Sequence, residues 1–177
     1  MRISIQRTGD DLRVRMRLDA QRRRRLAALT ALWILAIQGV IIGLWALLAP
    51  MLWYRDFPGF GLNWVAMDGP YNHHLTSDVG ALFLALAVMT AAALFYADGL
   101  PARVAGAGWT VFGIPHLLYH AFHHPDGMST GGFVFMAVAI ALVPILGLIA
   151  VFVTPRERLP LRDPAPMNFR LPRRRHR

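Results

Sequence analysis

The sequence contains no cysteine and no lysine, and it has few charged residues of any kind. Without cysteine the chain has neither a disulfide framework nor a thiolate metal site, so any bound metal must be held by nitrogen and oxygen atoms. Charged residues make up only 16% of the 177 residues, whereas hydrophobic residues make up 55%. This balance lies outside the usual range for a soluble globular domain.

The hydrophobic residues are concentrated in four blocks, each close to the roughly 20 residues that a helix needs to cross the hydrocarbon core of a bilayer. The blocks are residues 26–49, 75–97, 104–122 and 131–153. A helix in a soluble bundle would show polar residues every few positions, because one side must face water. The pattern therefore predicts an all-α integral membrane protein, a four-helix bundle over residues 26–153. We expect a basic arm before it, residues 1–25, and a Pro/Arg-rich tail after it, residues 154–177.

The 19 basic residues are all Arg, and their positions indicate the orientation in the membrane. All but Arg55 lie in residues 2–25, at Arg103 or in residues 156–177, which share one side of a four-span protein. The positive-inside rule then places both termini in the cytoplasm and the spans in the cell membrane. Topology accounts for the net charge of +9, so we do not expect a nucleic-acid partner. Anionic lipid headgroups are the expected partners of the Arg-rich ends.

Residues 3–18 of the arm alternate apolar and polar side chains, with Thr8-Gly9-Asp10-Asp11 in between. This pattern is typical of a short β-hairpin. A lone hairpin is marginal in water, so it would need the membrane surface, a partner or a second copy of the chain, and a floppy basic arm is the alternative. The tail after Thr154 has too few apolar residues to pack, and we expect it to be disordered.

Two further patterns concern the packing of the bundle. Gly39 and Gly43 have the small-xxx-small spacing that lets helices approach closely, and we expect them to pack within the chain rather than in a dimer. Residues 51–74 form an extracytoplasmic segment rich in Trp, Tyr and Phe. Such rings favour the headgroup layer, but a segment of this length can also fold back as a lid over the end of the bundle.

Six of the seven histidines fall in two clusters. His73 and His74 precede the second span, while the third span ends with His116, His120, His123 and His124. Since these spans are antiparallel neighbours, we expect both clusters at the extracytoplasmic surface. The spacing of i, i+4, i+7 and i+8 places the four later imidazoles along one stripe of a helix. An ionisable side chain as deep in the membrane as His116 is a functional candidate by default.

Neutral imidazole binds zinc, copper and iron, and two histidines four residues apart on a helix can hold one ion together. Asp78 lies one turn after His74 and can serve as a ligand or fix a histidine tautomer. No Glu lies on this side, which disfavours a carboxylate-bridged di-iron site. The sequence therefore predicts a transition-metal site between the second and third spans. Its residues are His74, Asp78, His116 and His120, with His73, His123 and His124 as adjuncts.

Each of these residues also has a purely structural interpretation. His123 and His124 can end a helix as cations that complement its dipole. Asp78 can accept hydrogen bonds from the first-turn amides, and the histidines before the second span can be loop residues with nothing bound. For the two deeper histidines of the third span burial is costly, although a hydrogen bond to a carbonyl freed by Pro115 can explain one of them.

The stretch His116-Leu-Leu-Tyr-His120-Ala-Phe-His123-His124 resembles the His-xxx-His and His-xx-His-His boxes of membrane fatty-acid desaturases and hydroxylases. The resemblance implies iron, because those boxes hold two irons. It covers nine residues. Those enzymes have more histidines in three separated boxes, are considerably longer and present the boxes to the cytoplasm, so the resemblance is local.

A second resemblance extends over roughly the last three spans. It is carried by His74-Leu-Thr-Ser-Asp78-Val-Gly80-Ala-Leu-Phe-Leu-Ala-Leu-Ala and by Phe112-Gly-Ile-Pro115-His116-Leu-Leu-Tyr-His120. These motifs are similar to those of an uncharacterised group of small four-span bacterial membrane proteins, for which no activity is assigned. The resemblance implies the helical bundle and includes the four main candidate ligands in the shared pattern. It leaves the function open.

Four functions are compatible with the sequence. The first is binding of a transition metal for sensing, storage or transfer, and the second is a hydroxylase-like metalloenzyme acting on a lipid or quinone. The third is ligation of a b-type haem by one histidine from each span. The fourth is proton-coupled transport, with Asp78 and the histidines as a relay. An oligomer or a partner membrane protein is compatible with each of them.

Overall fold

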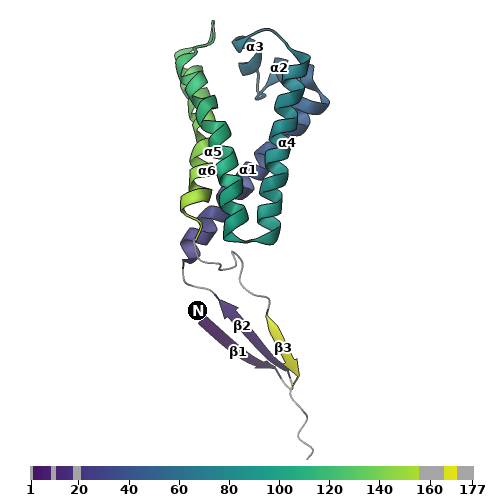
Figure 1. Ribbon diagram of the computed structural model, residues 1–177, viewed down its shortest axis with the longest axis vertical. Coiled ribbons are helices and arrows are strands. Elements are labelled where there is room, and N and C mark those ends of the chain that lie inside the picture. The colour runs from purple at the N-terminus through teal and green to yellow at the C-terminus, as the bar shows by residue number, and fades with distance from the viewer. Residues whose placement is uncertain (1, 9–10, 18–20, 156–165, 171–177) are drawn as a thin grey trace, which may run out of the picture.

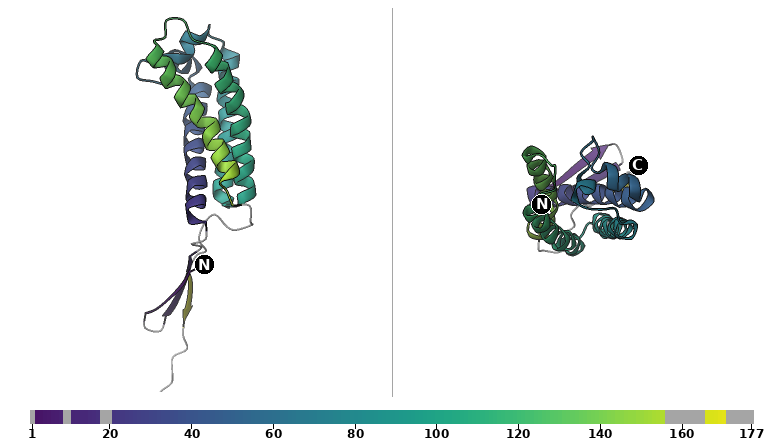
Figure 2. Two further views of the ribbon diagram at one scale, coloured as in Figure 1. Left: turned by 90° about the vertical axis from the view of Figure 1, so that its left-hand side faces the viewer. Right: turned by 90° about the horizontal axis from the view of Figure 1, so that it is seen from above.

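The computed structural model describes residues 2–8, 11–17, 21–155 and 166–170, and these residues are mainly helical. Four long helices lie side by side (Figure 1), namely α1 (Arg22–Leu48), α4 (His73–Tyr96), α5 (Gly99–Phe122) and α6 (Thr130–Phe152). Two short helices at one end of this bundle are α2 (Pro50–Asp56) and α3 (Trp64–Asp68). A small sheet lies beyond the other end, as Figure 2 also shows.

The later helices begin where the sequence supplies a capping side chain. Asn72, Asp98 and Ser129 are the N-caps of α4, α5 and α6, and each side chain accepts a hydrogen bond from a first-turn amide. Short polar side chains of this kind satisfy amides that have no partner within the helix. The four apolar blocks are confirmed as helices, which begin one to five residues before their blocks.

Three of the long helices, α1, α4 and α6, are long and apolar enough to cross a membrane. This finding fits a multi-pass membrane protein. Helix α5 is as long as α4, at 24 residues each, but it is not among these three in the described part of the chain. Its composition differs because it contains Arg103, two prolines and four glycines.

Helices α1 and α4 pack closely because glycines face one another where the helices meet. A Cβ added to Gly80 would lie 2.7 Å from the amide nitrogen of Leu47 and 3.0 Å from the carbonyl oxygen of Gly43. A Cβ added to Gly39 would lie 3.0 Å from the Cβ of Ala87. Backbone atoms therefore occupy space that side chains would otherwise fill. The expectation that Gly39 and Gly43 pack within the chain is confirmed.

Helices α5 and α6 form a second pair with the same kind of contact. A Cβ added to Gly106 would lie 2.7 Å from the carbonyl oxygen of Gly147. A Cβ added to Gly113 would lie 2.8 Å from Cδ of Pro144, which is a residue inside α6. The bundle thus consists of two helix pairs, each held together by the close approach of backbones.

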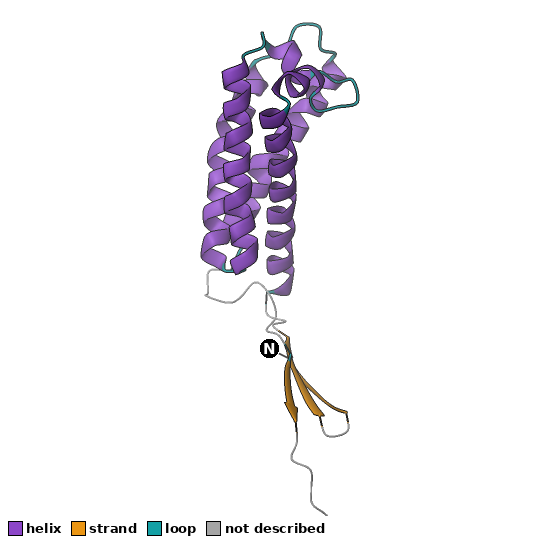
Figure 3. Ribbon diagram, turned by 90° about the vertical axis from the view of Figure 1, so that its right-hand side faces the viewer, coloured by secondary structure: helices purple, strands orange, loops and turns teal. Residues whose placement is uncertain are grey.

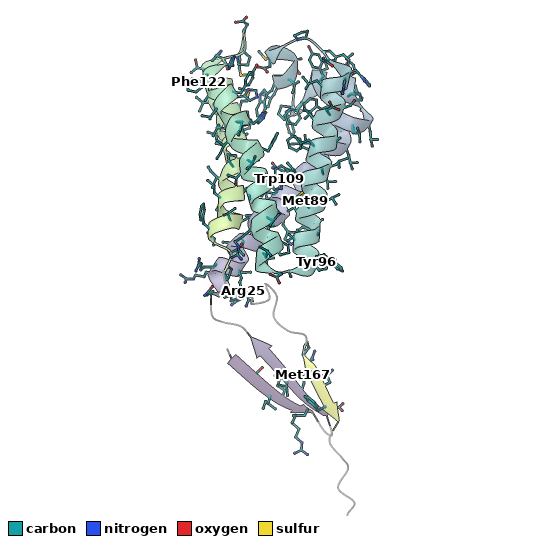
Figure 4. The ribbon with its side chains drawn as sticks, in the orientation of Figure 1. Arg25, Met89, Tyr96, Trp109, Phe122 and Met167 are labelled. Atoms are coloured by element: carbon teal, nitrogen blue, oxygen red, sulfur yellow. The ribbon has the colours of Figure 1, made fainter. Side chains whose placement is uncertain are left out.

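A buried hydrogen bond joins the two pairs near the middle of the bundle. The indole N–H of Trp109 donates to Oγ1 of Thr90 at 2.8 Å, and both residues are fully buried. The ring of Phe83 on α4 meets that of Trp109 on α5, with centroids 5.8 Å apart. Since a buried indole N–H requires a partner, this bond fixes the height of α4 relative to α5. Figure 4 shows Trp109 between the two ends of the bundle.

The small sheet has three antiparallel strands in the order β1-β2-β3 (Figure 3). Strand β1 (Arg2–Thr8) pairs with β2 (Asp11–Arg17), so the predicted hairpin is confirmed. The turn predicted at residues 9–10 lies outside the described residues. Ile5 lies opposite Val14 in this register, so these two apolar residues share one face of the sheet.

The third strand corrects the prediction of a disordered tail. Strand β3 (Met167–Arg170) pairs with β2, with Leu12 opposite Phe169 and Val14 opposite Met167. Met167 and Phe169 thereby extend the apolar face of the hairpin, and a three-stranded sheet is more stable than an isolated hairpin. The rest of the tail, residues 156–165 and 171–177, lies outside the described part of the chain.

We predict that Gly80→Ala destabilises the bundle, because the added Cβ meets backbone atoms of α1. We expect the free energy of unfolding in detergent to fall by about 1–3 kcal/mol. Gly131→Ala is the matched control, since nothing lies within 4 Å of its Cβ position. Thermal unfolding followed by circular dichroism measures the effect. Equal melting temperatures for the two variants would contradict the close packing of α1 on α4.

Candidate functional site

His116 and His120 lie one turn apart near the C-terminal end of α5. Their rings meet edge to face, with centroids 4.8 Å apart, and the ring of His116 stacks on Phe112 at 5.3 Å. Both side chains are partly buried. Nδ1 of His120 is buried and has no hydrogen-bond partner, so a carbonyl freed by Pro115 does not account for this nitrogen. The fold brings two imidazoles together and leaves a ring nitrogen available to a ligand.

The predicted stripe of four helical histidines is wrong beyond His120, because α5 ends at Phe122. His123 is extended, and its Nδ1 lies 2.8 Å from the carbonyl oxygen of Tyr119, on whose ring it stacks at 4.2 Å. Nδ1 of His124 lies 3.1 Å from another backbone carbonyl. The proline that follows His124 disfavours helical backbone at this histidine, which explains the early end. Both residues thus have structural partners at the end of the helix.

The histidines at the start of α4 lie on its exposed surface. Nδ1 of His74 is 3.0 Å from Oδ2 of Asp78, and these side chains are 85% and 64% exposed. Asp78 does not accept from the first-turn amides, since Asn72 performs that role. His73 is exposed and meets the ring of Tyr71 at 6.3 Å. The two histidines therefore belong to the helix rather than to a loop.

The periodicity of α4 explains why this pair does not face α5. The buried stripe at this end of the helix contains Thr76, Gly80 and Phe83. His74 and Asp78 are each two residues from this stripe, which corresponds to about 160–200° around the helix. The predicted convergence with the histidines of α5 is therefore not seen. Among the described residues, no group of three or more His, Cys, Asp or Glu side chains is placed to hold a metal ion.

A chain of aromatic side chains crosses the end of the bundle above the histidine pair. Trp45 of α1 contacts Phe57, Phe57 contacts Trp64 of α3, and Trp64 contacts Phe135 of α6, with centroids 5.6–6.2 Å apart. Trp64 is buried. The segment between α1 and α4 therefore connects the first helix pair to the second, as expected of a lid rather than of an interfacial belt alone. Figure 4 shows Phe122, the last residue of α5, at this end of the bundle. The histidine pair lies shortly before Phe122 in the sequence.

Asp68 is a carboxylate at this end of the bundle that the sequence prediction of the site did not include. It is the last residue of α3, and the Met67 side chain beside it lies 3.9 Å from the Cβ position of Gly127 in the α5–α6 loop. The Asp68 carboxylate acts electrostatically on both His116 and His120. The sequence offered no signal for this proximity, because no helical period relates a short loop helix to α5.

No protein-family model matches the chain, and neither the curated proteins nor the solved structures include a match. The two resemblances of the histidine motifs therefore stay predictions. What the fold defines is a class: a helical protein with several candidate membrane spans, a pair of partly buried histidines and an aromatic lid. The function has to be argued from the geometry of this site.

We predict that Trp64→Ala loosens the lid, because Trp64 links Phe57 to Phe135 and is buried. Backbone amides of residues 57–71 should exchange with deuterium at least severalfold faster than in the wild type. Trp33→Ala is the control, since Trp33 is 51% exposed on α1. Hydrogen exchange with mass spectrometry measures the difference. Unchanged exchange in the Trp64 variant would show that the aromatic chain does not hold the lid.

Proposed function

We propose that the chain crosses the bilayer four times, with both termini in the cytoplasm, and binds a transition metal ion at its extracytoplasmic face through His116 and His120. The observation that carries the metal site is the buried, unpartnered Nδ1 of His120 beside a second imidazole. The membrane topology and the metal site are supported by different features and are tested separately.

The length and packing of α5 support a fourth crossing. Its 24 residues correspond to about 36 Å of helix, which exceeds the hydrocarbon core of about 30 Å. Only Ala97 and Asp98 separate α4 from α5, so the second helix must return along the first. Gly106 and Gly113 pack α5 against α6 over several turns. Helix α5 therefore lies alongside α4 and α6, and it crosses the bilayer together with these two spans.

The distribution of arginines supports the orientation. Arg24 donates a hydrogen bond to the carbonyl of Phe152 at 3.2 Å, which places the arginine run at the end of the bundle where α6 terminates. At the opposite end, among the described arginines, lies Arg55, which pairs with Asp56 through two hydrogen bonds of 2.8 Å. This pairing holds the pKa of the Asp56 carboxyl below its ordinary value. The positive charge therefore accumulates at one end, which the positive-inside rule assigns to the cytoplasm.

The same arginines are suited to anionic lipid headgroups. Arg22, Arg23 and Arg24 are exposed at the start of α1, and Arg103 lies at the same end, where it donates to the carbonyl of Pro155. Each arginine near an anionic surface contributes about 1 kcal/mol of attraction, which falls off within a Debye length. These lipid contacts anchor the cytoplasmic end of the bundle. They account for the arginines without a nucleic-acid partner.

Reporter fusions test the topology. A fluorescent protein joined after Ala97 or after Val153 should fluoresce, because both positions are cytoplasmic in the proposed topology. A fusion of alkaline phosphatase after Asp126 should be enzymatically active, because it is exported. The reciprocal fusions serve as controls at each position. An inactive phosphatase together with a fluorescent protein after Asp126 would show that α5 does not cross.

The chemistry of the histidine pair favours a metal. A buried polar atom without a hydrogen bond costs about 1–3 kcal/mol, and coordination to an ion satisfies it. Imidazole nitrogens four residues apart on a helix are suited to one ion, and zinc, copper and iron all accept this ligand. His74 and Asp78 are a second, exposed pair and are not required for ligation by His116 and His120.

The geometry gives less support to the other functions. A b-type haem needs an axial histidine from each of two facing helices, whereas His73 and His74 lie on the exposed surface of α4. A proton relay through Asp78 would need this carboxylate inside the bundle, and its side chain is 64% exposed. A hydroxylase-like reaction is compatible with a metal at the histidine pair, so metal binding is the common first step to test.

We predict that the full-length protein purified in detergent carries a stoichiometric transition metal, and that His116→Ala/His120→Ala loses at least nine-tenths of it. His123→Ala/His124→Ala should retain the wild-type amount, because those imidazoles have structural partners. Elemental analysis after growth with zinc, copper and iron measures the content. If the wild type carries no more metal than the double variant at His116 and His120, the metal proposal is wrong.

A further inference from the structure

The short helix α3 is fixed against the second helix pair by contacts on two sides. Trp64 at its start meets Phe135 of α6 edge to face at 5.6 Å. Met67 near its end lies beside Gly127 of the α5–α6 loop. These contacts direct the C-terminal end of α3, and so Asp68, toward the end of α5 where the histidine pair lies.

Asp68 differs in its surroundings from Asp56 and Asp78, two other carboxylates at this end of the bundle. Asp56 is paired with Arg55, and Asp78 is paired with His74. The described side chains provide neither an ion pair nor a hydrogen bond for Asp68, which is exposed. Its carboxylate has a favourable charge interaction with the imidazoles of His116 and His120, and the residue before it, Met67, lies beside the α5–α6 loop.

The chain around α3 allows this carboxylate to move. Gly61 precedes the helix with a φ of +74°, and Gly69 follows Asp68 directly. Glycines on both sides of a five-residue helix can absorb backbone rotations that other residues resist. In this structure the described His, Asp and Glu side chains form no three-ligand group, so the carboxylate lies short of ligation distance.

We propose that Asp68 is the third protein ligand of the metal site, and that α3 moves toward α5 when a divalent ion binds. This inference rests on the proposed function, because it presumes that His116 and His120 hold a metal. Two imidazoles and one carboxylate are suited to zinc or iron and leave coordination positions open to water or a substrate. The carboxylate also compensates part of the ion's charge next to an apolar bundle.

Titration of the full-length protein in detergent with cobalt(II) tests this proposal. The visible absorption of bound cobalt reports both affinity and ligand set. Asp68→Asn should weaken binding at least tenfold and alter the spectrum, whereas Asp126→Asn should leave both unchanged. Asp126 is a matched control, because it is an exposed carboxylate in the neighbouring α5–α6 loop. Asp68→Glu, which keeps the carboxylate, should recover part of the lost affinity.

A second measurement reports the movement of α3. Hydrogen exchange of residues 64–71 should slow when cobalt(II) is added to the wild type and to Asp126→Asn, but not to Asp68→Asn. Equal melting temperatures of the two metal-free variants establish that both are folded.

The possible failures are distinguishable. If the His116/His120 variant loses cobalt while Asp68→Asn binds it as the wild type does, Asp68 is not a ligand and the proposed function stands. If the wild type itself binds no cobalt, zinc, copper or iron, both proposals are wrong.

Discussion

The contact of backbone with backbone at the glycines of the two helix pairs is the constraint on which the rest of the bundle depends. Gly80 lies against α1, and Gly106 lies against α6, at distances that leave no room for a Cβ. Each pair is therefore fixed as a unit, since neither helix can slide without a clash. The hydrogen bond between Thr90 and Trp109 then sets the relative height of the two units.

The end of the bundle next to α2 and α3 is built differently from its middle. Near the middle, Phe83 of α4 contacts the rings of Trp109 and Phe112 of α5, and the histidine pair lies further along α5 toward its C-terminal end. The aromatic chain through Trp64 instead connects the end of one unit to the other. Consequently the end of α5 is covered by a segment that is itself held by both units.

Much of the architecture followed from local signals. The apolar blocks and the glycine spacing each depend on a few neighbouring residues, and the structure agrees with both predictions. The alternation in the arm likewise predicted the β1–β2 pairing. The prediction of a histidine stripe was wrong beyond the end of α5. It required a continuous helix up to His124, whereas the proline that follows His124 disfavours helical backbone there. The third strand was missed because its partner lies about 150 residues earlier in the chain.

The sequence by itself determined that the chain consists of long apolar helices with arginines at one end, because hydrophobic length and charge are properties of each segment. It also determined the pairing of His116 with His120, because a spacing of four residues fixes neighbours on a helix. Only the tertiary structure decided how α4 is rotated about its axis. This rotation places His74 and Asp78 on the exposed surface of the bundle. The tertiary structure likewise decided that α3, which ends with Asp68, contacts α6 through Trp64 and the α5–α6 loop through Met67. Both depend on how helices pack against one another, which no single segment specifies.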